Sequence, residues 1–301
     1  MELSIPIQTG STKPNRLKLT LRYLRRNKSL VVGLAMLAFL LIFSIGGSLL
    51  IDTSTRAYPL AAPAVQPPSA EYPLGTDRDG RDLLAVMARG ILLTGSIGVM
   101  AGSIGLFVGV VLGFLAGYYG GWVDSVIRWV TEVLMTIPPL ILKIIIASTI
   151  VDKNKVTIFT MAGVASILSW MGTARVVRSQ VLSLRERTFV SVAKLSGMSN
   201  LEIIFKELMP NMLPYLAASF VGAVMGGIGS SFGLEVLGLG PAREPTIGMT
   251  IRWAQFHSAI FNQWWWWVLW PSLALVMIFA SLSLINRGLD EIANPRVRRS
   301  E

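Results

Sequence analysis

Cysteine is absent from the 301-residue chain, and histidine occurs only once, at His257. Without cysteine the chain can form no disulfide, no iron–sulfur cluster and no thiolate metal site. A single histidine also argues against a histidine-rich metal centre. We therefore expect no metal site in this chain, and we interpret His257 as an exposed residue of a loop.

Charged residues are scarce, at 15% of the chain, whereas apolar residues make up 52%. A water-soluble protein of this size usually carries about a quarter charged residues. The apolar residues fall in blocks of about 20, which is the length of helix that crosses roughly 30 Å of hydrocarbon. The sequence therefore predicts an all-α integral membrane protein, with membrane lipid around its apolar surface.

Six apolar blocks predict six transmembrane helices. The first block is longer than the apolar segment of a cleaved signal peptide, so we interpret it as a signal-anchor helix. The expected helices are Leu30–Ile51, Gly90–Tyr118, Val130–Val151, Val156–Val176, Met212–Phe232 and Trp265–Ile285. They divide the chain into a basic tail (1–29), the first helix (30–51), a loop (52–89), a core of five helices (90–286) and a second tail (287–301).

The net charge of +10 would suit a nucleic-acid partner in a soluble protein. Here the basic residues gather in the gaps between apolar blocks, so we interpret them as topology signals and expect no nucleic acid. Six crossings put both tails on one side, which carries 18 lysines and arginines against 8 on the other. The positive-inside rule therefore predicts that both termini are cytoplasmic and that the loop 52–89 is external.

Two of the expected helices carry glycines three or four residues apart, a spacing that places them on one face. In lipid, such a face lets a second helix approach closely, so both faces are predicted to be packing surfaces. The glycines are Gly105, Gly109, Gly113 and Gly117 in the second helix, and Gly222, Gly226, Gly229 and Gly233 in the fifth.

The loop at 183–210 is too large to be a simple turn and carries the signals of two short helices. Two serine–glutamate pairs have the spacing of a capping box, which marks the start of a helix. Gly197 lies between the two starts and suits the left-handed residue that ends a helix. We expect two capped helices joined by a sharp turn. The pairs are Ser183 with Glu186 and Ser199 with Glu202.

The same loop resembles the EAA loop of binding-protein-dependent ABC permeases. Ala193, Gly197 and Pro210 occur at the spacing of that pattern, whereas Ser191 stands where the family usually has glutamate. In that family the loop docks into a cleft on the ATPase subunit and transmits its motion. The resemblance implies an ATPase-coupling site made of Phe189, Ser191, Ala193, Gly197, Glu207 and Pro210.

A second segment, 74–82, resembles the LGTDxxGRD signature of the second, C-type permease subunit of the dipeptide, oligopeptide and nickel class. It lies between the first and second expected helices, as it does in that class. Its signature residues are Gly75, Asp77, Gly80, Arg81 and Asp82. The chain is identified as a member of this class, which implies the type I ABC importer permease fold with a cytoplasmic coupling helix.

No Gly-Lys dipeptide occurs in the chain, so it has no P-loop for a nucleotide. We therefore expect no catalytic residue and no bound cofactor, with ATP and Mg on partner subunits. The resemblance implies a sister permease subunit, one or two ABC ATPase subunits and an external solute-binding protein as partners. It also implies a bacterial or archaeal plasma (inner) membrane as the location.

The solute stays open between an oligopeptide, an oligosaccharide and nickel, with nickel least favoured by the single histidine. A membrane-embedded enzyme and a channel are the alternatives outside ATP-driven import. An enzyme would need polar catalytic groups inside the spans, where only Lys143 and Glu132 are near that depth. A channel would need a pore helix or a ring of charge, and neither is evident in the sequence.

Three residues are candidates for the translocation pathway. A charge inside a span, such as Lys143, is a functional candidate by default, with snorkelling or a carboxylate of the sister subunit as alternatives. Trp264 begins a run of four tryptophans, which favours an interfacial aromatic belt or else stacking platforms for sugar rings. Glu235 stands in a segment that is usually less acidic in the family.

Overall fold

The computed structural model describes residues 27–150 and 156–293. Within these residues the regular structure is helical, apart from one isolated bridge between Thr76 and Asp82. Two of the elements, η1 and η2, are π-helices, which are wider than α-helices. The elements are α2 (Lys28–Leu50), α3 (Thr53–Arg56), α4 (Leu83–Phe114), η1 (Leu115–Tyr119), α5 (Gly121–Thr136), α6 (Pro139–Ile150), α7 (Ile158–Ser166), α8 (Trp170–Arg185), α9 (Thr188–Leu195), α10 (Asn200–Glu202), η2 (Ile203–Leu208), α11 (Met209–Val236), α12 (Ile247–Phe256) and α13 (Trp265–Ala293).

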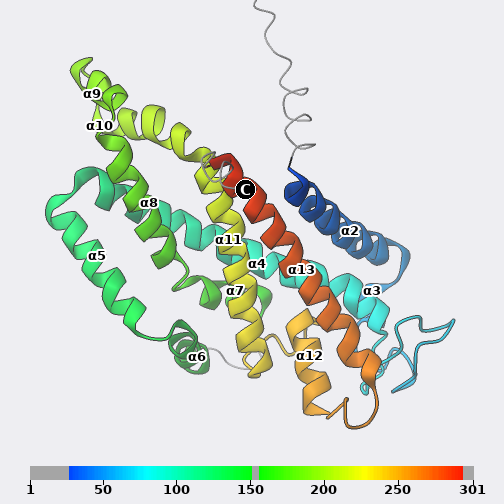
Figure 1. Cartoon of the computed structure of the whole chain (residues 1–301). Coiled ribbons are helices and arrows are strands. Elements are labelled where there is room, and N and C mark those ends of the chain that lie inside the picture. The colour runs from blue at the N-terminus through cyan, green and yellow to red at the C-terminus, as the bar shows by residue number, and fades with distance from the viewer. Residues whose placement is uncertain (1–26, 151–155, 294–301) are drawn as a thin grey trace, which may run out of the picture.

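Four continuous helical stretches of the described chain are long and apolar enough to cross a membrane, or five if the bent pair α5–α6 counts as one span. They contain α2, α4, α11 and α13. The first and last of these lie side by side (Figure 1), and Asn27 Nδ2 at the start of α2 donates to Gly288 O of α13 at 3.2 Å. The all-α membrane fold is thus confirmed, while the count of six crossings stays a prediction.

Within the third expected span, Val130–Val151, the prolines Pro138-Pro139 predict a kink, and the structure confirms it. The chain breaks between α5 and α6 and turns by 86°. The break falls at Pro138-Pro139, because a proline has no backbone N–H and its ring clashes with the preceding turn. The fourth expected span is also broken, between α7 and α8, and its second part continues to Arg185.

The second expected span begins earlier than predicted, at Leu83, because Asp82 caps the helix there by accepting a hydrogen bond from the Leu84 N–H at 3.0 Å. An Asp at this position satisfies one of the orphan donors of the first turn. The helix therefore extends beyond the predicted apolar stretch at its N-terminal end, through buried residues that follow the Asp82 cap.

The glycine face of α4 is a packing surface, as predicted. A methyl group added at Gly113 would meet a Cβ atom of α8 at 2.7 Å, and one added at Gly105 would meet the Cβ atom of its N-cap, Ser169, at the same distance, so the two helices approach as closely as glycine allows. The glycine face of α11 is packed only in part, since a methyl group added at Gly233 would meet Leu140 Cδ1 at 3.2 Å. Added methyl groups at Gly222 and Gly226 would meet no heavy atom within 4 Å, because no helix of the described chain covers this part of α11.

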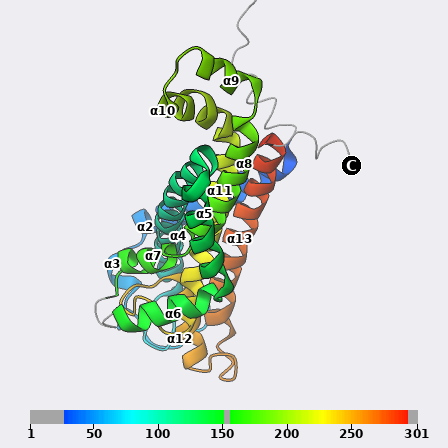
Figure 2. The same ribbon diagram turned by 90° about the vertical axis from the view of Figure 1, so that its left-hand side faces the viewer.

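The two ends of the bundle carry different structures (Figures 1 and 2). One end carries α9, α10 and η2, a helix–turn–helix at 188–208 that we call the elbow. The opposite end carries residues 52–82 together with α12, which we call the distal lobe. A buried hydrophobic cluster joins α2, α4, α11, α12 and α13 between the two ends, and a second one joins α8, α11 and the elbow.

Gly109→Ala is expected to destabilise the protein by about 1–3 kcal/mol, as overpacking does in a close contact. The new methyl group would meet Trp170 O at 2.7 Å. Gly95→Ala is the matched control, because Gly95 lies on the same helix with no heavy atom within 4 Å of an added Cβ. Thermal unfolding in detergent should lower the midpoint only for Gly109→Ala, and equal midpoints would contradict the contact described here.

Candidate functional site

The elbow turns sharply at Gly197, whose φ is +78°. The Gly197 N–H donates to Lys194 O at 3.0 Å, and the Met198 N–H donates to Ala193 O at 3.2 Å. These two bonds form the Schellman arrangement, which satisfies the last carbonyls of a helix. Gly197 thus occupies the left-handed position that the sequence predicted.

The second helix of the elbow begins with a capping box, as predicted. Ser199 Oγ accepts from the Glu202 N–H at 3.3 Å, and the Glu202 carboxylate accepts from the Ser199 N–H at 3.0 Å. The other predicted box is wrong, because Ser183 lies inside α8 and α9 begins after Arg187 without a side-chain cap. The helix continues through Ser183 because its buried face still packs at Val181.

One side of the elbow is buried against its own chain. Val190 and Ala193 of α9 join Ile203 and Leu208 of η2 in a cluster with Val181 of α8. Ala193, which the sequence assigned to a docking surface, therefore packs inside the chain. The large apolar side chains of the elbow that remain exposed are Val192 (55%), Leu195 (90%), Leu201 (61%) and Phe205 (60%).

The remaining residues assigned to the coupling site lie on both faces of this structure. Phe189 is half-buried against the same cluster, and Ser191 is exposed on α9. Glu207 is half-buried in η2, and Pro210 is exposed at the second position of α11. The structure thus brings the predicted residues to one end of the bundle, where Gly197 sets the turn between them.

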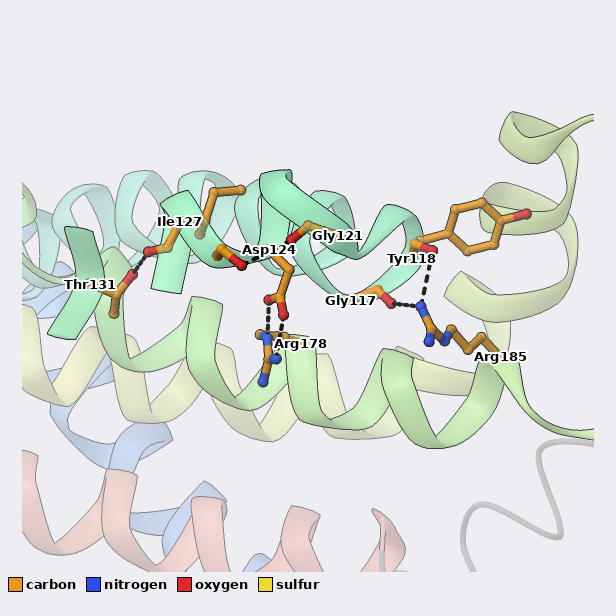
Figure 3. A network of polar contacts seen from close by, with 9 residues as sticks. Gly117, Tyr118, Gly121, Asp124, Ile127, Thr131, Arg178 and Arg185 are labelled. Carbon is orange, nitrogen blue, oxygen red and sulfur yellow. Dashed lines mark hydrogen bonds and ion pairs between the residues drawn. The ribbon is translucent and has the colours of Figure 1, made fainter. Parts of the chain in front are cut away.

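Polar contacts tie the elbow end of α8 to η1 and α5 (Figure 3). Asp124 of α5 and Arg178 of α8 form a two-pronged ion pair, with one of its N–O distances at 2.6 Å. Arg185 at the end of α8 donates to Gly117 O at 3.0 Å and to Tyr118 O at 3.3 Å. The last carbonyl groups of a helix have no hydrogen-bond partners within that helix. Arg185 supplies the missing donor for two such carbonyls at the end of η1. The end of α8 that leads into the elbow is therefore anchored to the bundle by directed contacts.

A groove of about 390 Å³ lies between α8 and α11, and Gly222 and Gly226 are part of its lining. Lys143 of α6 lines the same groove, and its Nζ donates to Ser230 Oγ at 2.6 Å. The Lys143 side chain is only 4% exposed, so it does not snorkel to the surface. The hydroxyl side chains that line the groove belong to Ser169, Thr173, Tyr215, Ser219 and Ser230.

Glu235, a predicted pathway residue, lies outside this groove. Its side chain is 1% exposed and accepts hydrogen bonds from Ser231 Oγ at 2.6 Å and from Thr246 Oγ1 at 2.7 Å. Thr246 is the N-cap of α12, so Glu235 joins the end of α11 to the start of α12. The carboxylate is enclosed by its own chain, and this corrects the assignment from sequence.

The tryptophan run belongs mainly to the interior of the distal end. Trp266 and Trp267 are buried, and Trp266 Nε1 donates to Thr76 O at 3.1 Å. His257 stacks on Trp267 with ring centroids 5.6 Å apart, so it is half-buried rather than exposed as predicted. Trp264 is half-buried in the same cluster and is not among the residues that line the groove.

The signature residues of the distal lobe form its joint with α4. Gly75 and Gly80 have φ values of +80° and +74°, which favour glycine. The Asp77 carboxylate accepts from the Arg81 N–H at 2.8 Å and from its guanidinium at 3.2 Å, while Asp82 caps α4. Burial raises the pKa of both carboxyls above their ordinary values, and the Arg81 guanidinium opposes this rise at Asp77.

Long apolar helices, with a groove between two of them and an elbow at one end, define a multi-pass membrane protein. Residues 109–299 match the family described as binding-protein-dependent transport system inner membrane component. Residues 15–68 match the N-terminal TM domain of oligopeptide transport permease C. The chain belongs to this family of inner membrane components and is a permease subunit of an ABC importer.

Curated relatives match along nearly the whole chain. The oligopeptide transport system permease protein OppC of Mycobacterium tuberculosis is 31% identical over 285 residues, which cover 94% of this chain and 96% of the relative. The dipeptide transport system permease protein DppC of Bacillus subtilis is 30% identical over 278 residues, which cover 92% and 85%. In such importers ATP hydrolysis takes place on separate subunits.

The ion pair of Asp124 with Arg178 is expected to stabilise the junction of α5 and α8, because its side chains are only 16% and 25% exposed. A double-mutant cycle with Asp124→Asn and Arg178→Gln should give a coupling energy of about 0.5–3 kcal/mol in unfolding experiments. The control is the exposed pair of Glu202 with Lys206, which should give less than about 1 kcal/mol. Equal coupling energies for the two pairs would contradict the anchoring role.

Proposed function

We propose that this chain forms half of a translocation pathway for oligopeptides that an external binding protein delivers. The observation that carries the proposal is its full-length similarity to permeases named for oligopeptide and dipeptide transport. The oligosaccharide alternative has less support, because these relatives are named for peptides and two of the four tryptophans, Trp266 and Trp267, are buried in the distal cluster. A nickel solute has no support from metal-binding side chains, since the described residues contain no group of three His, Cys, Asp or Glu that could hold a metal ion.

The elbow is the proposed contact with an ATPase subunit. Its most exposed large apolar side chain, Leu195, is 90% exposed on α9, and Val192 is 55% exposed one turn away. Together with Leu201 and Phe205 they gather several exposed apolar side chains on one short segment, and such a patch usually marks a contact with a protein or lipid partner. The Gly197 turn fixes the angle within the elbow and the Arg185 contacts fix the end of α8 that precedes it, so the elbow can pass on a movement that a loose loop would absorb.

The elbow end is proposed to face the cytoplasm, with both termini on that side. The excess of lysine and arginine on the side of the two tails supports this orientation. A sister permease is proposed to close the groove, because Gly222 and Gly226 of α11 have open space where a packed helix would otherwise lie. The full transporter would then contain this chain, the sister permease, one or two kinds of ABC ATPase subunit and the external binding protein.

Leu195→Asp is expected to lower co-purification of the ATPase about tenfold or more. A charge buried in an interface without a partner is costly, and loss of a buried interface anchor commonly exceeds about 1 kcal/mol. Leu60→Asp is the control, because Leu60 is 92% exposed in the distal lobe and should not affect this association. Unchanged ATPase recovery with Leu195→Asp would exclude this side chain from the contact.

Gly197→Val is expected to uncouple ATP hydrolysis from uptake, because a β-branched residue at φ +78° costs about 1–3 kcal/mol in strain. Gly197→Asn is the matched control, since asparagine tolerates the left-handed conformation. Both variants are compared in vesicles that hold the complete transporter. The measurements are peptide uptake, and ATPase activity with and without loaded binding protein. If Gly197→Val keeps wild-type coupling, the elbow is not the coupling element.

A further inference from the structure

Lys143 is a buried cation with no acidic partner in the part of the chain that the structure describes. Its Nζ donates to Ser230 Oγ at 2.6 Å, and no described carboxylate lies within 4.0 Å of it. The side chain is 4% exposed. An ammonium group held inside a span is costly without a counter-charge, so such a residue usually meets an anion.

The bend before α6 explains how this lysine reaches the groove. The 86° turn lays α6 across the distal end of the bundle, where it meets α11 (Figure 2). Ser230 of α11 accepts a hydrogen bond from Lys143, so the serine hydroxyl can still donate its own proton. An anion beside the ammonium could therefore accept from both groups at once.

The elements that line the groove cannot supply that anion themselves. The helices α6 and α8 contain no Asp or Glu, and α11 contains one, Glu235. The Glu235 carboxylate already accepts from Ser231 and Thr246 and is enclosed outside the groove. The groove itself has a volume of about 390 Å³ and a lining rich in hydroxyl groups, which suits a polar chain passing through it.

We propose that Lys143 and Ser230 form a carboxylate-binding subsite in the groove, which takes the terminal carboxylate or an acidic side chain of a peptide in transit. This inference rests on the proposed function as a peptide permease. It assigns the subsite a specificity role, in which a negatively charged group of the solute neutralises the lysine during passage. The two sources of the carboxylate are distinguished by the choice of probe peptide.

The test measures uptake by the complete transporter in vesicles, at concentrations of peptide that saturate the binding protein. The probes are one short neutral peptide as its free acid, the same peptide as its C-terminal amide, and an amide that contains one aspartate. The variants are Lys143→Met, Lys143→Arg and Ser230→Ala. The control is Lys28→Met, since Lys28 is an exposed lysine on α2, which contributes no lining residue to the groove.

Lys143→Met is expected to lower uptake of the free acid about tenfold or more, as the loss of a charge-assisted hydrogen bond does. Uptake of the neutral amide should stay within about twofold of wild type. Lys143→Arg should keep most of the uptake of the free acid because it keeps the charge, and Ser230→Ala should give a smaller loss. If Lys143→Met lowers uptake of the aspartate-containing amide as much as it lowers uptake of the free acid, the subsite also takes acidic side chains.

Two results would overturn the subsite. In the first, Lys143→Met lowers uptake of the acid and the amide equally. In the second, the variant loses the sister permease on purification, which would assign the lysine to a contact between subunits. The proposed function fails separately, if the wild-type transporter imports none of the peptides that its binding protein holds. Wild-type import with an unchanged acid-to-amide ratio in Lys143→Met would leave the peptide permease intact and remove only the subsite.

Discussion

Close contact with α4 is the constraint on which the rest of the bundle depends. Within a membrane the hydrophobic effect gives helices little reason to associate, so contact must come from close van der Waals packing. Glycines such as Gly105 and Gly113 allow α8 against one face of α4, and Gly102 allows α11 against another, where an added methyl group would meet Val224 N at 2.7 Å. The two walls of the groove are thereby fixed to one shared helix.

The same helix, α8, forms a groove wall and holds the elbow. Ser169 and Thr173 near its start line the groove, whereas Val181 packs against the elbow and Arg185 binds the end of η1. Under the proposed coupling role, a displacement applied at the elbow would reach the groove along this one helix of 16 residues. No chain of side-chain rearrangements is needed to connect the two sites, because one element belongs to both.

Sequence patterns predicted correctly those features that depend on residues close together in the chain. The left-handed Gly197, the Ser199 capping box and the glycine face of α4 all follow from residues a few positions apart. The ion pair of Asp124 with Arg178 could not be predicted in this way, because its members are 54 positions apart and their spacing has no periodic signal. Hydropathy showed the apolar length of the third span and Pro138-Pro139 predicted a kink in it, but the 86° angle could not be predicted, because it depends on what α6 packs against.

Lys143 and Glu235 show the same limit for the site. The sequence identified both as unusual charges in or near a span, and the two side chains meet opposite environments in three dimensions. Ser230 and the open groove surround the lysine, whereas Ser231 and Thr246 enclose the glutamate. The difference arises because Ser230 and Ser231 are neighbours in sequence and project from α11 in directions roughly 100° apart.

The π-helix η2 at the start of α11 controls which residues of that helix face the groove. From Asn200 to Val236 the chain is one continuous helical stretch, so the rotational phase of everything beyond η2 is fixed by the wide turn at its root. A π-turn holds one residue more than an α-turn, so loss of one residue within η2 would return the backbone to α-helical bonding and leave later side chains near their present directions. The same loss within the regular helix that follows would turn all later side chains by roughly 100° about the helix axis. Gly222, Gly226 and Ser230 would then leave the groove together, although none of them had been altered. The wide turn therefore lets the chain change length by one residue beside the elbow while the groove keeps its lining.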